Sequence, residues 1–200
     1  MIKESECENR MCKKINELNG LTSQTVLNKY WKKKEYPIDI AQILYEMNIK
    51  VSAFDFSKAE ALAGVPSGDI LGAVLTYGDN VAIVYKKGDS LNRIRFTLAH
   101  ELAHCCLSHI KPDANGYIEF RRQQSFNDEH EIAANIFAGE LLIPENALSG
   151  VLATYFKNSF PASEFLAKFF AVSVNVMEER LKHLKIPFID KSNMKVVIFD

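Results

Sequence analysis

The sequence predicts an α+β fold that is mostly helical, with a small antiparallel β-sheet packed against a helix carrying a His-Glu-x-x-His motif. Three observations support this class. Apolar residues recur at helical spacing over most of the chain, a Val-, Ile- and Tyr-rich region lies between residues 49 and 85, and the motif falls in the apolar stretch 96–104.

Composition indicates one globular domain with a core of ordinary size. The chain has 200 residues, of which 48% are hydrophobic and 24% charged. Its net charge of -1 does not indicate nucleic acid or an anionic membrane as a partner. The polar start, Met1–Glu6, has no apolar signal core, and no apolar run approaches the length of a membrane span. We therefore expect a cytoplasmic protein with reduced cysteines, in which Cys105 and Cys106 pack on the motif helix rather than coordinate a metal.

The N-terminal part reads as a leader followed by two helices. Residues 1–21 are polar and poorly defined. Thr22 or Ser23 can cap a helix that has Lys32–Lys34 in its last turn and ends at Pro37, and a second helix is expected over residues 38–47.

Strands are predicted over residues 49–54, 70–77 and 81–85, because β-branched and aromatic residues are frequent there and Gly78-Asp79-Asn80 is a strong hairpin signal. The motif helix follows over residues 91–108. Residues 111–127 read as a long irregular connection.

A further helix is predicted over residues 128–142, its apolar side formed by Ile132, Ile136, Phe137, Leu141 and Leu142. We expect residues 22–145 to form the core and residues 146–200 a C-terminal cap. The cap would hold two helices, 162–170 and 174–184, and a last strand at 194–199. This pair resembles a helix-turn-helix, but Glu178 and Glu179 accompany its basic residues, so a packed cap is favoured over DNA binding.

The motif predicts a metal site. In a helix, His100 and His104 lie about 40° apart around the axis and ~6 Å along it, so both rings can reach one ion. Glu101 is rotated by about 100° and is better placed to touch a water on that ion than to bind it.

Zinc held by two histidines requires a third protein ligand, and a catalytic site leaves the fourth position to water. The downstream candidates are Glu119, Asp128, Glu129, His130, Glu131 and Glu140. We favour Glu131, because it faces the same way as Asn135, which could orient a ligand by a hydrogen bond. His130 is the second choice, and His109 is expected to point away from the metal.

Two segments, RFTLAHELAH (95–104) and EIAANIFAGELLIP (131–144), resemble the ImmA/IrrE metallopeptidase family, and the likeness extends over roughly residues 22–185. The resemblance implies that Glu131 is the third zinc ligand, in a zincin-like core similar to that of gluzincins. It also implies a zinc endopeptidase with Glu101 as general base. The implied substrate is a helix-turn-helix repressor or an antitoxin-like regulator of a mobile element, prophage or stress response.

Two questions stay open at this point. A second donor to the oxyanion could be Tyr77, Tyr85, Tyr117 or His109. The rival function is a non-proteolytic regulatory module with structural zinc that binds a partner protein or DNA, and an intact Glu101 with only three ligands argues against it.

Overall fold

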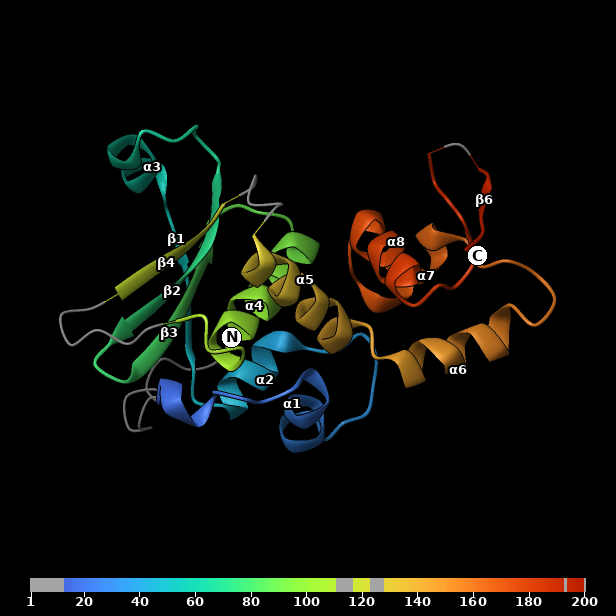
Figure 1. The fold of residues 1–200 in the computed structure, drawn as a ribbon, viewed down its shortest axis with the longest axis horizontal. Coiled ribbons are helices and arrows are strands. Elements are labelled where there is room, and N and C mark those ends of the chain that lie inside the picture. Colours follow the sequence, from blue (N-terminus) through green and yellow to red (C-terminus); the bar gives the residue numbers. More distant parts are fainter. Residues whose placement is uncertain (1–12, 111–116, 123–127, 193, 200) are drawn as a thin grey trace.

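The computed structural model describes residues 13–110, 117–122, 128–192 and 194–199. A β-sheet lies at one end of the molecule and a C-terminal helical unit at the other (Figure 1). Between them lie the two central helices, α4 (Leu91–Cys106) and α5 (Glu129–Leu142). The predicted α+β class is confirmed.

The sheet has four strands in the order β1-β3-β2-β4: β1 (Lys50–Phe54), β2 (Ile70–Tyr77), β3 (Asn80–Lys86) and β4 (Tyr117–Arg122). β2 pairs antiparallel with both β3 and β4, but β1 pairs parallel with β3. The prediction of a purely antiparallel sheet is therefore wrong. A parallel pair needs a crossover, which is supplied here by β2 together with an unpredicted helix, α3 (Ser57–Ala63).

β4 lies within the connection that was predicted to be irregular. Its pairing with β2 covers the side of the hairpin that would otherwise form an edge of the sheet. Residues 111–116 and 123–127 of this connection lie outside the described residues.

Two short helices, α1 (Ser23–Tyr30) and α2 (Ile40–Glu46), follow a 3-10 turn, η2 (Ile15–Glu17). Thr22 caps α1, as one of the two predicted candidates, and its side chain accepts a backbone N–H bond from Thr25. Asp39, which was not predicted as a cap, accepts one from Gln42 at the start of α2. α1 ends at Tyr30, so the lysines at 32–34 lie beyond its last turn, contrary to prediction. The predicted leader lies outside the described residues up to position 12.

The motif helix α4 begins at Leu91, as predicted, and packs on β2, β3 and α5. It ends at Cys106 rather than Ser108, because Ser108 adopts a left-handed backbone conformation with φ +61°. The next residue, His109, then donates its backbone N–H to the carbonyl of His104 at 3.0 Å. This is the Schellman pattern, which satisfies a carbonyl that the helix leaves without a partner.

α5 contacts three other helices, α4, α1 and α8. Its buried surface includes the small residues Ala134 and Ala138, which let a neighbouring backbone approach closely. Ile132 and Ile136 are 47% and 37% exposed, so their prediction as members of the buried side is wrong.

The C-terminal unit contains α7 (Ser163–Phe170), α8 (Val174–His183) and a small sheet of β5 (Phe188–Ile189) and β6 (Val196–Val197). An unpredicted helix, α6 (Glu145–Tyr155), leads into it; Pro144 caps this helix rather than only ending the previous one. Among the described residues no single helix is long and apolar enough to span a membrane. The bent pair α5 and α6 passes that test together, by length and composition only.

Two arginines attach the C-terminal unit to the central helices. Arg95 on α4 donates from Nε to the carbonyl of Ala171 at 2.9 Å, and Arg180 on α8 donates to the carbonyl of Ile143 at 3.3 Å. The unit is thus fixed against both helices that carry the candidate site.

Glu60 closes the loop that leads into β2. Its buried carboxylate accepts the backbone N–H groups of Gly68 and Ile70 at 2.9 and 3.0 Å. The bond from Gly68, helped by the one from Ile70, lowers the pKa of Glu60 against the opposing effect of burial.

A carboxyl with a lowered folded-state pKa stabilises the fold above its unfolded-state pKa, and this contribution disappears as pH falls through the folded-state value. We expect Glu60→Gln to lower the urea midpoint at pH 7, and the gap from the wild-type chain to narrow as the pH is lowered below about 4. Urea unfolding across this pH range checks the prediction, and a gap independent of pH would contradict it.

Candidate metal centre

Three side chains from two helices converge on one point: His100 and His104 on α4, and Glu131 in the first turn of α5. The two Nε2 atoms lie 2.9 Å apart, and each lies 3.2 Å from one carboxylate oxygen of Glu131. Both imidazoles are buried. These three residues form a group whose ligand atoms all lie within 4.8 Å of one another.

The donor spacing fits a metal ion. An ion with tetrahedral geometry and metal–nitrogen bonds of 2.0–2.1 Å would separate its donors by about 3.3 Å. The observed separations of 2.9 and 3.2 Å are close to this value. The three side chains could therefore hold a metal ion without a rearrangement of either helix.

The charge state of Glu131 also fits a metal site. Burial alone would raise the pKa of its carboxyl, but hydrogen bonds to His100 and His104, together with charge on those rings, hold the pKa well below its ordinary range. The carboxylate thus stays ionised and faces a position suited to positive charge.

Asn135 lies one turn after Glu131 and contacts the far side of His100, with 2.9 Å between Asn135 Oδ1 and His100 Nδ1. The amide oxygen is an acceptor, so Nδ1 of His100 donates to it, and a metal ion could replace the proton on Nε2 without loss of this bond. The structure therefore places Asn135 where the sequence predicted it.

Glu101 is fully buried, and its carboxylate lies close to β2 of the sheet. Gly72 on β2 makes room for it: a Cβ at this position would lie 2.9 Å from Glu101 Oε1 and 2.5 Å from Thr97 Cγ2. Sequence reasoning did not single out Gly72. A glycine inside a strand pattern, which often marks a close approach of other groups, was the available signal.

Three of the other candidates for the third ligand, His130, Asp128 and Glu140, make other contacts. His130 stacks on His109, with ring centroids 4.1 Å apart. Asp128 caps α5, and Glu140 accepts a hydrogen bond from Ser23.

The prediction that His109 points away from the metal is wrong. Its Nδ1 lies 3.0 Å from Nδ1 of His104. The prediction extended the helix past Ser108, whereas the turn there folds His109 back over His104. Burial, with the neighbouring rings of His104 and His130, lowers the pKa of His109 to about 4.

Cys105 and Cys106 are buried in the core. Burial raises the pKa of both thiols, that of Cys106 to about 12, and so keeps them neutral. They lie in the packed interior, as expected.

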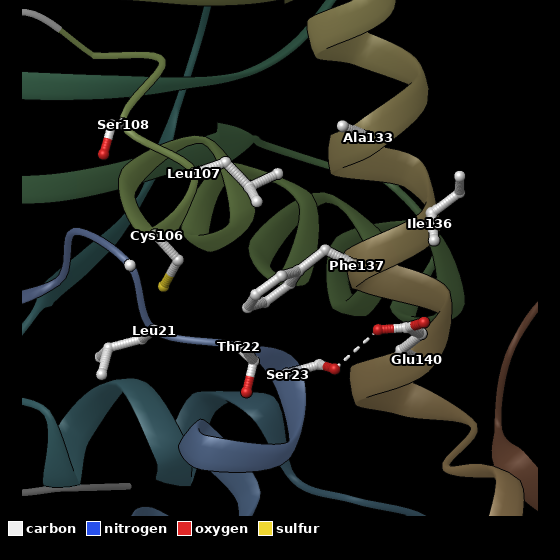
Figure 2. A pocket seen from close by; sticks show the side chains of 11 residues that line it. Leu21, Thr22, Ser23, Cys106, Leu107, Ser108, Ala133, Ile136, Phe137 and Glu140 are labelled. Carbon is white, nitrogen blue, oxygen red and sulfur yellow. Dashed lines mark hydrogen bonds between the residues drawn. The ribbon is translucent and has the colours of Figure 1, made fainter.

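A pocket of about 500 Å³ lies between α1, α4 and α5 (Figure 2). Its walls are mostly apolar, and include Leu107 and Phe137, while a hydrogen bond between Ser23 and Glu140 crosses one side. None of the three converging residues lines it, so the pocket is separate from the candidate metal centre.

A His-Glu-x-x-His helix that packs on a sheet and receives a glutamate from a later helix defines a metallopeptidase type of site. Residues 47–182 match the family model Peptidase_M78, described as the IrrE N-terminal-like domain. The chain therefore belongs to this peptidase family. No curated protein matches the sequence significantly.

We expect Glu131→Ala to weaken metal binding more than about 100-fold, since loss of groups that only orient a ligand already costs 10–100-fold. His130→Ala should have a much smaller effect, because His130 stacks outside the group. Competition with a chromophoric chelator measures both affinities, and the opposite ranking would show that the wrong neighbour was chosen as the ligand.

Proposed function

We propose that the protein is a zinc-dependent endopeptidase. The observation that carries the proposal is the convergence of His100, His104 and Glu131 beside Glu101 on the same helix. Three protein ligands leave one position open, as in catalytic rather than structural zinc sites. Zinc, when bound there, would lower the pKa of a water and polarise a peptide carbonyl.

Glu101 is the proposed general base. It follows His100 directly on α4 and does not belong to the group of candidate ligands. In this role it takes a proton from the attacking water and returns it to the leaving amine. Its place against the sheet next to Gly72 limits where the carboxylate can move.

Tyr85 is the candidate that the fold favours as second donor to the oxyanion. It is directly opposite Gly72 across the hairpin, and such cross-strand pairs share one face of a sheet. Gly72 faces Glu101, so Tyr85 lies on the catalytic side. Tyr77 is 74% exposed at the hairpin end of β2, and His109 already contacts His104.

We further propose that the substrate is a helix-turn-helix repressor or an antitoxin-like regulator, as the resemblance to the ImmA/IrrE family implies. A substrate segment could extend the sheet in β conformation. Since β1 covers β3 and β4 covers β2, the addition would occur at one of the two outer strands, β1 or β4, rather than directly at the hairpin.

The surroundings of α8 support the packed cap over DNA contact. Arg180, the strongest phosphate binder on that helix, is buried and bonded to Ile143, with Glu140 3.8 Å away. On the exposed side, Lys182 pairs with Glu179 at 2.7 Å.

We expect Glu101→Gln to lower the rate of regulator cleavage by about 10²–10⁴-fold, the usual contribution of a general base, while metal binding is retained. Incubation of the chain with purified helix-turn-helix regulators, followed by gel electrophoresis, checks the rate. A biological effect that persists in this variant would instead favour the non-proteolytic binding module.

Gly72→Ala is expected to reduce cleavage at least about tenfold with metal content unchanged, because the added methyl group must displace Glu101 or Thr97. Gly150→Ala is the matched control, since a Cβ there meets nothing within 4 Å. Equal activity of the two variants would contradict the placement of Glu101.

A further inference from the structure

His100 and His104 each have a polar contact at Nδ1, and the two contacting residues come from different parts of the chain. The ring of His100 contacts Asn135 through Nδ1, and the ring of His104 contacts His109 through Nδ1, at 2.9 and 3.0 Å. In both rings the opposite nitrogen, Nε2, faces Glu131. Each candidate ligand thus has one polar partner on the side away from the centre.

Two imidazole nitrogens at 3.0 Å must share one proton, because two lone pairs or two N–H groups would repel. If Nε2 of His104 binds a metal, its Nδ1 carries the proton. His104 then donates, and Nδ1 of His109 accepts. His109 is therefore placed to accept the proton that Nδ1 of His104 carries when Nε2 is a metal ligand.

The backbone explains how His109 reaches this position. The left-handed Ser108 ends α4, and the Schellman bond from the His109 N–H to the His104 carbonyl places the third residue after the helix over its last turn. Such motifs usually bring two apolar side chains together here, and this chain brings two histidines. The stacked ring of His130 fixes the other face of His109.

We propose that His109 is a positioning residue that holds His104 in its metal-binding tautomer and orientation. This inference rests on the proposed metal site but not on peptidase turnover, so it can be tested by metal binding alone. It makes the end of α4 part of the metal centre.

The test compares two variants in the full chain. His109→Phe keeps a flat ring against His130 but removes the acceptor, whereas His109→Asn replaces Nδ1 with an amide oxygen. We expect His109→Phe to weaken zinc binding by about 10–100-fold and to change the visible spectrum of the cobalt(II)-loaded protein. His109→Asn should recover most of the affinity, and His183→Phe, on the exposed face of α8, should match the wild-type chain.

Urea unfolding of the metal-free variants separates positioning from folding. The proposal requires the two His109 variants to differ in zinc affinity more than in metal-free stability. It is overturned if His109→Phe binds zinc like the wild-type chain, or if both variants lose affinity and stability together. A wild-type chain that binds no zinc would overturn the proposed function, and this inference with it.

Discussion

The packing of α4 on α5 is the contact on which the rest of the structure depends. It brings two buried imidazoles from one helix against one carboxylate from the other, with nitrogen–oxygen distances of 3.2 Å. An ionised carboxylate in such surroundings requires a compensating positive charge. Arg95 and Arg180 fix the C-terminal unit to the same two helices, so distant parts of the chain help to hold their spacing.

Two faces of α4 and its C-terminal end carry different parts of the candidate site. The face toward α5 carries the candidate metal ligands, while the buried Glu101 lies against β2, where Gly72 leaves space for it. The C-terminal end turns at Ser108 and adds His109 to the centre. The proposed chemistry therefore depends on a helix that is held along its length by a sheet, a second helix and its own terminus.

Local rules predicted much of this arrangement from sequence. The start of α4, the cap of α1, and the common direction of Glu131 and Asn135 follow from helix chemistry and periodicity. Local rules did not predict the long-range strand pairing, because the parallel contact of β1 with β3 depends on a crossover that no local pattern encodes. Ile132 was misplaced because apolar residues occur on more than one side of α5, so periodicity does not mark its buried face. His109 was misplaced because the left-handed Ser108 redirects the chain.

The central claim is that His100, His104 and Glu131 together bind one metal ion. X-ray absorption at the zinc edge, combined with metal analysis of the purified chain, tests it most directly. We expect one zinc per chain, with two imidazole nitrogens and one carboxylate in its coordination sphere at about 2.0–2.2 Å. A chain that binds no zinc after supplementation, or zinc bound by sulfur from the cysteines, would contradict it.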